Sequence, residues 1–188
     1  EHDFPIIFDK IKTAYNYVPK IATIDELKKV SGAGIFHWAT HGGEGKLADK
    51  STDMYSLMTA EVYNNGKDTV EYKDDFAQNR LTYFAGGIKK DSTGAEHLLW
   101  YYGITPAFVA KYMSFSQNSL VFIFACTSYN PLIIDGFRKA QASAYLGWDK
   151  PVLISDGYYA SVFFFDRCFG TNVCVPFASP PQRPFEYQ

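Results

Sequence analysis

The stretch Ile35-Phe36-His37-Trp38-Ala39-Thr40 leads directly into His41, and a second apolar stretch, Leu120-Val121-Phe122-Ile123-Phe124-Ala125, leads into Cys126. Short apolar runs that stop at turn-forming residues are typical of buried strands in a parallel sheet. The carboxyl ends of such strands are where α/β folds place their reactive groups. The sequence therefore predicts an imidazole and a thiol at one edge of a parallel sheet, as a candidate base and a candidate nucleophile.

Helix and strand signals alternate on both sides of these runs. Thr23 or Asp25 caps a helix through Val30, and Thr105-Pro106 is a cap followed by proline at the first helical position. The other expected elements are a strand over 18–22, helices over 107–113, 132–142 and 158–169, and a strand over 144–148. Strands separated by helix-length spacers predict an α/β fold with a doubly wound, mostly parallel sheet, helices on both of its faces, and one domain over residues 1–175.

Residues 50–100 interrupt this alternation and are expected to form an insertion. We predict a glycine-rich loop over 42–45, a short helix over 54–63, and an inserted β-hairpin made by the alternating segments 69–72 and 80–84. An insertion of this length could lie over a cleft as a lid or an inhibitory flap. The proline-rich residues 176–188 predict an extended tail on the surface.

Composition bounds the class of protein. The chain has 188 residues, 47% hydrophobic and 20% charged, which suits a globular domain with a sizeable core. Its 18 Lys and Arg residues are balanced by 20 Asp and Glu residues without a basic block, so no nucleic-acid partner is expected. No stretch approaches the roughly 20 apolar residues that span a bilayer, so no membrane span is expected. The start at Glu1, without an initiator methionine, predicts that an upstream segment has been removed.

The histidine and the cysteine suit nucleophilic catalysis if the fold brings them together. A cysteine attacks as the thiolate, which requires a nearby base and partial exposure to solvent. If the two strands are neighbours in a parallel sheet, the strand spacing predicts a separation of roughly 5 to 10 Å between His41 and Cys126. Gly42 and Cys126 would then both direct a backbone N–H into the cleft, where two donors can hold an oxyanion. On composition alone, a core cysteine and a hydrogen-bonded histidine explain both residues equally well.

A family resemblance rests on three segments: Phe36-His37-Trp38-Ala39-Thr40-His41-Gly42-Gly43, Phe122-Ile123-Phe124-Ala125-Cys126 and Ala142-Ser143-Ala144-Tyr145-Leu146-Gly147-Trp148. Through them the chain resembles the caspase-like cysteine peptidase superfamily over roughly residues 17 to 175. The pattern is closest to that of the CHAT-type and the gingipain- or clostripain-related bacterial members. In that superfamily a His-Gly pair ends one strand and an Ala-Cys pair ends the next, and the order here agrees.

The resemblance implies that Cys126 is the nucleophile, that His41 is the general base or acid, and that the backbone N–H groups of Gly42 and Cys126 form the oxyanion hole. It implies an endopeptidase that cleaves a peptide or protein substrate after a specific residue through a thioester acyl-enzyme, without a cofactor. The family sheet begins with a strand and a helix that have only Ile6-Ile7-Phe8 and a brief helix over 9–14 as counterparts here. An upstream segment of the same precursor is therefore a candidate partner that completes the pocket. The compartment is left open, with a bacterial periplasmic or secreted location preferred to the cytoplasm.

Pocket residues are expected after the strand over 144–148. Trp148 could form a wall of the pocket, and Asp149 and Asp156 could pair with a lysine or arginine side chain of the substrate. An aspartate after a strand is also an ordinary turn former or helix cap, and Trp148 suits core packing equally well. We prefer Asp149 among the three.

The remaining motifs do not predict a metal site. His37 and His41 are four residues apart, as in zinc-binding helices, but they lie on a strand-like run without a third ligand. The acidic residues over 68–75 match no calcium loop. Cys168 and Cys174 are either two buried small hydrophobic residues or, in an oxidising compartment, a disulfide. The alternative function, from a different class, is a catalytically silent caspase-like module that binds a partner or peptide in the same cleft.

Overall fold

The structure, a computed structural model, describes residues 20–47 and 52–168. Residues Ile21–Pro151 form one compact unit, and the two ends of the chain, Glu1–Lys20 and Val152–Gln188, form another. Of this second unit, Lys20 and Val152–Cys168 are described, and they carry helix α7 (Ile154–Cys168). The assignment of residues 1–175 to a single domain stays a prediction.

A three-stranded parallel sheet lies in the larger unit, as the apolar runs predict. It consists of β1 (Ala33–Ala39), β6 (Phe115–Phe124) and β7 (Ala144–Leu146), in the order β1-β6-β7. The last six residues of β6 are buried, which explains why that strand is a continuous apolar run. The chain therefore has a mixed α/β fold with a parallel sheet.

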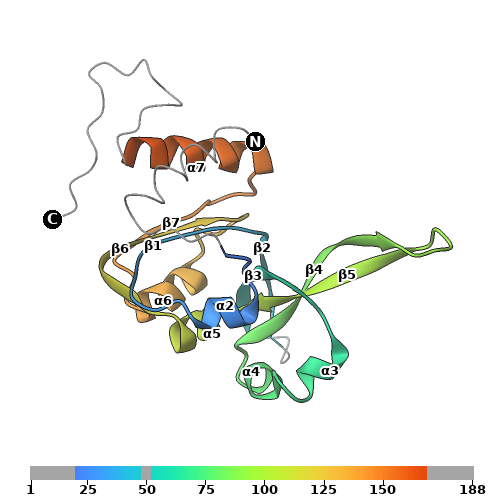
Figure 1. Cartoon of the computed structure of the whole chain (residues 1–188). Helices are drawn as coiled ribbons and strands as arrows, with labels where there is room; N and C mark the ends of the chain where they lie inside the picture. The colour runs from blue at the N-terminus through green and yellow to red at the C-terminus, as the bar shows by residue number, and fades with distance from the viewer. Residues whose placement is uncertain (1–19, 48–51, 169–188) are drawn as a thin grey trace. The chain divides into compact units, whose positions relative to one another are not determined.

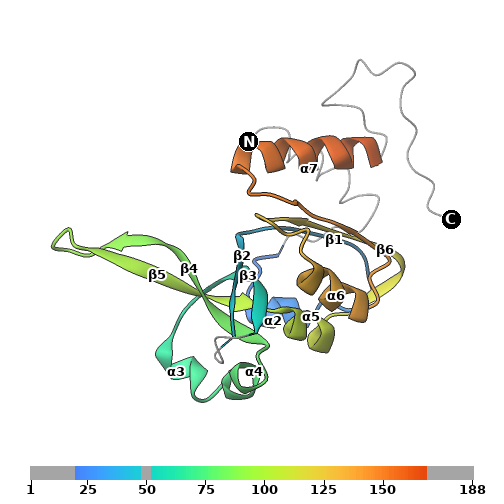
Figure 2. The same cartoon turned by 180° about the vertical axis from the view of Figure 1, so that it is seen from behind.

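Two helices pack on one face of this sheet, α5 (Pro106–Tyr112) and α6 (Pro131–Lys139) (Figures 1 and 2). Both begin with proline at the first turn, which has no backbone N–H to leave unpaired. Phe137 of α6 is fully buried against the rings of Phe36, Phe115 and Tyr145. Burial of such a side chain contributes about 1.5–3 kcal/mol. The expectation of helices on both faces stays a prediction, because α7 belongs to the other unit.

Helix α2 (Ile24–Lys28) begins at the predicted cap, with the Thr23 hydroxyl accepting a hydrogen bond from the Glu26 N–H. The expected strand over 18–22 is wrong in the part that is described, because Ile21 and Ala22 are not in a strand. Residues 18 and 19 lie outside the described residues. So do the expected strand Ile6-Ile7-Phe8, the helix over 9–14 and the tail over 176–188.

A second sheet, antiparallel and four-stranded, replaces much of the irregular insertion expected from the sequence. It consists of β2 (Gly42–Lys46), β3 (Asp53–Val62), β4 (Leu81–Lys90) and β5 (Glu96–Ile104), in the order β2-β3-β5-β4. The predicted loop over 42–45 and the predicted helix over 54–63 are therefore wrong. In β3, the side chains of Tyr55, Leu57 and Thr59 share one buried face, and Ser56 on the other face is buried as well.

The inserted hairpin exists, but with other bounds than predicted. Its strands are β4 and β5, and it extends away from the body of the unit (Figures 1 and 2). At its tip the Asp91 carboxylate accepts hydrogen bonds from the N–H groups of Thr93 and Ala95, and Gly94 has a left-handed φ of 86°. Residues 69–72, expected as its first strand, instead form the turn between α3 (Asn65–Asp68) and α4 (Lys73–Ala77).

One hydrophobic core joins the two sheets. Trp38 and Ile123 from the parallel sheet and Leu57 and Ile104 from the antiparallel sheet belong to the same buried cluster. Helices α2 and α5 contribute Leu27 and Phe108 to it. The shared core holds the two sheets together within the unit Ile21–Pro151.

Candidate active site at the carboxyl ends of β1 and β6

Residues Thr40 and His41 lie where the chain passes from the parallel sheet into the antiparallel sheet. The Thr40 N–H donates to the Phe124 carbonyl of β6 over 2.9 Å, while the His41 carbonyl accepts from the Met58 N–H of β3 over 2.9 Å. His41 is thus held by backbone hydrogen bonds on both sides. Its side chain is exposed.

Cys126 follows the neighbouring strand at the equivalent position. Ala39 pairs with Phe124 in the parallel register, so His41 and Cys126 each lie two residues beyond the last paired position. Parallel neighbours are about 4.8 Å apart, so the two chains leave the sheet side by side at the carboxyl ends of β1 and β6. Cys126 is half-buried. The structure therefore brings both predicted catalytic residues to one edge of the sheet.

Gly42 lies beside the cysteine turn and has a backbone N–H that the antiparallel ladder does not use. Because the His41 carbonyl is bonded to β3, the next residue directs its N–H and C=O away from that strand. Strand β2 is the outermost strand of its sheet. A Cβ on Gly42 would lie 3.0 Å from the Cβ of Ala125, the residue before Cys126. The geometry is compatible with the Gly42 N–H as an oxyanion donor.

The turn that carries Cys126 is tightly constrained. The Ser128 N–H closes it onto the Ala125 carbonyl over 3.3 Å, and Thr127 has a left-handed φ of 50°. Such a conformation is unusual for a β-branched residue. The Thr127 N–H donates to the Lys150 carbonyl over 3.2 Å. Strain of this kind persists only where surrounding contacts hold it, and it is frequent at functional sites.

Tyr55 of β3 joins this turn to the antiparallel sheet, a role that the sequence did not predict. Its side chain is fully buried, and its hydroxyl donates to the Cys126 carbonyl over 2.6 Å. Burial raises the pKa of Tyr55, and a hydrogen bond from the Thr127 hydroxyl only partly offsets this effect. The phenol therefore stays protonated and remains a donor. No local signal could have identified it, because its partner is 71 residues away.

Two of the three predicted pocket residues lie near this turn. The Tyr129 N–H donates to the Trp148 carbonyl over 2.8 Å, which brings the segment containing Trp148 and Asp149 alongside the residues after Cys126. The Asp149 side chain is exposed. The indole N–H of Trp148 is buried and has no hydrogen-bond partner among the described residues. Asp156 lies in the first turn of α7, in the other unit, so its position relative to Cys126 is not defined.

A second polar contact near the Cys126 turn, between Asn130 and Glu44, was also not predicted from the sequence. The Asn130 amide caps α6 by accepting from the Leu132 N–H, and its amide nitrogen donates to the Glu44 carboxylate over 3.0 Å. Glu44 is exposed on β2, two residues after Gly42. The signal in the sequence was Asn130-Pro131, a cap followed by proline, although nothing local indicates that it reaches β2.

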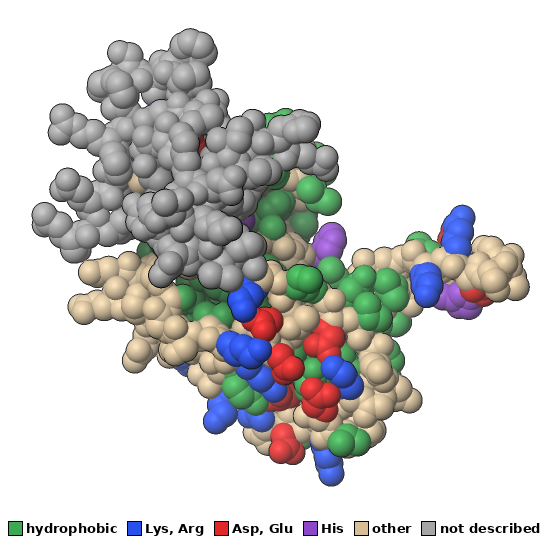
Figure 3. All heavy atoms as spheres, in the orientation of Figure 1, with side chains coloured by type: hydrophobic (Ala, Val, Ile, Leu, Met, Phe, Trp, Pro, Cys, Tyr) green, Lys and Arg blue, Asp and Glu red, His purple; other side chains and the backbone are tan. Residues whose placement is uncertain are grey.

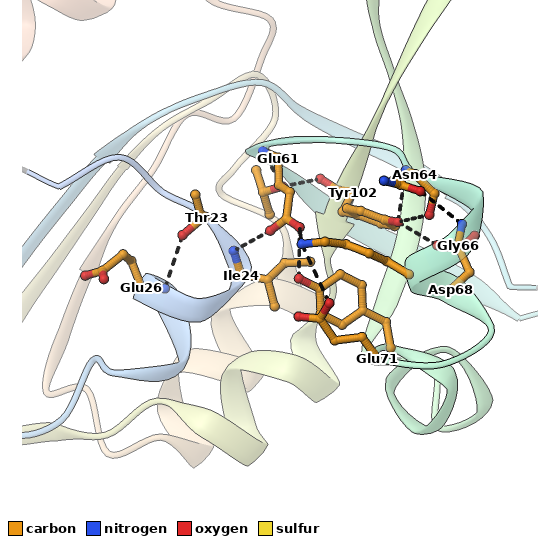
Figure 4. A network of polar contacts seen from close by, with 12 residues as sticks. Thr23, Ile24, Glu26, Glu61, Asn64, Gly66, Asp68, Glu71 and Tyr102 are labelled. Carbon is orange, nitrogen blue, oxygen red and sulfur yellow. Dashed lines mark hydrogen bonds and ion pairs between the residues drawn. The ribbon is translucent and has the colours of Figure 1, made fainter.

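A separate polar network around Glu61 is structural. Glu61 accepts hydrogen bonds from the Ile24 N–H, the Lys67 ammonium and the Tyr72 hydroxyl, over 3.3, 2.7 and 2.9 Å (Figure 4). Burial alone would raise the pKa of Glu61, but these bonds outweigh it and hold the pKa below its usual value. The network joins α2 to β3 and to the α3–α4 region. Because the Glu61 charge is fully paired, we do not regard it as a binding site.

Asp75 of α4 makes a similar cluster. It is buried and accepts hydrogen bonds from Lys28, Arg80 and Tyr112 over 2.8, 2.6 and 2.6 Å. Burial would raise the pKa of Asp75, but these three donors hold it below its usual value.

On this face of the molecule, basic and acidic side chains are interspersed over the α2, α3 and α4 region (Figure 3). The surface there forms no patch of a single charge.

The described residues hold no group of three His, Cys, Asp or Glu side chains that could bind a metal ion. The His37 ring packs against the Phe122 ring, with 5.3 Å between the ring centroids. Burial lowers the pKa of His37 to about 4. Cys168 is buried at the end of α7, whereas Cys174 lies outside the described residues, so their pairing stays open. Among the helices of the described part, none is long and apolar enough to cross a membrane.

Comparison with family models, with curated proteins and with solved structures finds no match for this chain. A functional assignment therefore depends on the residues and the geometry at the carboxyl ends of β1 and β6.

Proposed function

We propose that this protein is a caspase-like cysteine endopeptidase in which Cys126 is the nucleophile and His41 is the general base. The observation that carries the proposal is the parallel register, with His41 and Cys126 two residues beyond the Ala39–Phe124 pair. The partial exposure of Cys126 and the exposure of His41 suit a reactive pair, because a thiolate nucleophile needs access to its substrate.

The reaction would proceed by acyl transfer. His41 takes the proton from the Cys126 thiol, the thiolate attacks the substrate carbonyl, and the backbone N–H groups of Gly42 and Cys126 stabilise the oxyanion. Collapse of this intermediate expels the amine, which takes a proton from the imidazolium, and leaves a thioester. Water activated by His41 then hydrolyses the thioester and restores the thiol. No cofactor takes part in these steps.

The substrate in this proposal is a peptide with a basic residue before the scissile bond. Asp149 is exposed next to Trp148, in the segment bonded to the Cys126 turn. Glu44 adds a second carboxylate close to Gly42 on β2. A guanidinium or ammonium group gains charge-assisted hydrogen bonds from such carboxylates.

Labelling of the thiol tests the proposal. Near neutral pH, iodoacetamide should modify Cys126 of the wild-type protein, as measured by intact mass and peptide mapping. His41→Ala should slow this labelling about 10-fold or more, because the imidazole no longer takes the proton from the thiol. Cys168→Ser should leave the modification of Cys126 unchanged and serves as the matched control.

A peptide library with basic, acidic or asparagine residues before a reporter group then measures cleavage. We expect cleavage by the wild-type protein and none by Cys126→Ala. If Cys126 stays unmodified and no peptide is cleaved, the silent binding module replaces the peptidase. If only small thioesters or esters are cleaved, the site is an acyl hydrolase with the same dyad.

A further inference from the structure

Tyr55 makes contacts that are unusual for a core tyrosine. It is fully buried in β3, yet its hydroxyl contacts two consecutive residues of a turn on the other sheet. The hydroxyl donates to the Cys126 carbonyl over 2.6 Å, and the Thr127 side chain is near enough to lower the pKa of the phenol. One phenol thus holds the backbone of the nucleophile and lies beside the next residue.

The same phenol also packs against the strand that follows His41. A Cβ on Gly42 would overlap the Tyr55 hydroxyl, and it would lie 2.9 Å from the ring carbon Cζ. Only glycine leaves room for the tyrosine at this point. The phenol therefore lies between the Cys126 turn and the backbone of Gly42, and its size sets the spacing between them.

The Cys126 turn depends on contacts of this kind. Thr127 has a left-handed φ of 50°, which a β-branched residue adopts only when its surroundings hold it there. Its N–H is bonded to the Lys150 carbonyl, and its side chain lies beside the Tyr55 phenol. Without the phenol hydroxyl, the turn loses the hydrogen bond to its Cys126 carbonyl and is freer to relax.

We propose that Tyr55 is a positioning residue that holds the Cys126 thiol at its working distance from His41 and the Gly42 N–H, an inference that rests on the proposed function. The hydrogen bond of Tyr55 is to the carbonyl of Cys126 and not to its thiol. It acts through the carbonyl of Cys126 and the conformation of Thr127. A displacement of about 1 Å at a reacting group can reduce turnover by about 100-fold.

Tyr55→Phe tests this role, with Tyr145→Phe as the matched control. Tyr145 donates to the Ser128 carbonyl over 2.8 Å, so its replacement removes the same kind of bond from the same loop without touching Cys126 or Thr127. For Tyr55→Phe we expect kcat on a cleaved peptide to fall by about 10- to 100-fold, with KM within about threefold of the wild-type value. Tyr145→Phe should keep kcat within about twofold.

The pH dependence of iodoacetamide labelling distinguishes a positioning role from a purely structural one. If Tyr55 only stabilised the fold, the midpoint of Cys126 labelling would not change in Tyr55→Phe. In Tyr55→Phe the midpoint of Cys126 labelling should lie at a higher pH than in the wild type, because the thiol is no longer held against its base. In Tyr145→Phe the midpoint should stay at the wild-type value. If Tyr55→Phe does not fold, Thr127→Ala takes its place, with an expected fall in kcat of about 3- to 10-fold.

The outcomes separate the two proposals. A wild-type protein whose Cys126 is unreactive overturns the proposed function and this inference together. A reactive wild type, with Tyr55→Phe folded and unchanged in both kcat and labelling midpoint, overturns the positioning role alone. Wild-type turnover by Thr127→Ala, measured when Tyr55→Phe is unfolded, has the same consequence.

Discussion

Replacing Gly42 with alanine should destabilise the protein by more than an ordinary glycine substitution. The new methyl group would overlap the Tyr55 hydroxyl and approach Cζ of Tyr55 to 2.9 Å and Cβ of Ala125 to 3.0 Å. Tyr55 and Ala125 are both buried, so neither can move into solvent. The ring must shift, and its 2.6 Å hydrogen bond to Cys126 breaks.

The expected magnitude follows from these contacts. Overpacking a core costs about 1–3 kcal/mol, and an unpaired buried polar group costs about 1–3 kcal/mol. Alanine offsets about 0.4–1 kcal/mol of this by restricting the unfolded chain. We expect a net loss of about 2–3 kcal/mol, which for a chain of this length lowers Tm by roughly 5–10 °C.

Urea and thermal unfolding measured by circular dichroism provide the assay. Gly43→Ala is the control at the next position, because its methyl group would lie 3.6 Å from the Phe84 ring, an ordinary van der Waals contact. This substitution should change the free energy of unfolding by less than about 0.5 kcal/mol. In a Tyr55→Phe background, where the closest clash is absent, Gly42→Ala should cost about 1 kcal/mol less. Equal stability of the two alanine variants would refute the close packing of Tyr55 under Gly42.

Three further predictions concern charge. Asp75→Asn leaves the cations around this buried carboxylate without their partner, and it should lower the free energy of unfolding, measured in urea, by about 2–4 kcal/mol. The control is Asp74→Asn at the exposed neighbouring residue, which should leave the free energy of unfolding unchanged. Equal effects of the two substitutions would contradict this prediction. Because the folded pKa of Asp75 lies below its unfolded value, its stabilisation should be complete above about pH 4 and be lost as the pH falls through the folded pKa. Tm measured from pH 6 to 3 should therefore fall more steeply for the wild type than for Asp75→Asn, and parallel curves would argue against this. Asp149→Asn should lower kcat/KM about 10-fold for peptides with arginine or lysine before the scissile bond. For peptides with asparagine at that position, kcat/KM should stay within about twofold of the wild-type value. An equal loss for all peptides would show that Asp149 does not select the basic residue.

The parallel sheet could be predicted because its signals are local. The apolar runs of β1 and β6, the Thr23 cap of α2 and the prolines at the starts of α5 and α6 each specify an element within a few residues. Element bounds differ from the prediction by a few residues, as at α6, which ends at Lys139 rather than at residue 142. Helix ends depend on capping and packing that a local pattern describes only approximately.

The antiparallel sheet could not be predicted because its strands lack local signals. Residues 54–63 include Leu57, Met58, Ala60 and Glu61, which are good helix formers. They form a strand because β2 and β5 pair on its two sides and because Tyr55 and Leu57 enter the shared core. Likewise, Gly42–Lys46 is rich in glycine and becomes a strand only by pairing with β3.

The amino-acid sequence alone determined that an imidazole and a thiol follow two apolar strands, because continuous apolar runs and the residues that end them are properties of single segments. It also predicted that both strands are buried, which holds for the last six residues of β6, whereas in β1 only Trp38 is buried. The tertiary structure alone decided that these ends lie in register, that Gly42 must remain without a side chain, and that a tyrosine from a second sheet holds the cysteine turn. Register and packing arise from hydrogen bonds and contacts between residues far apart in the chain, and no local pattern contains them.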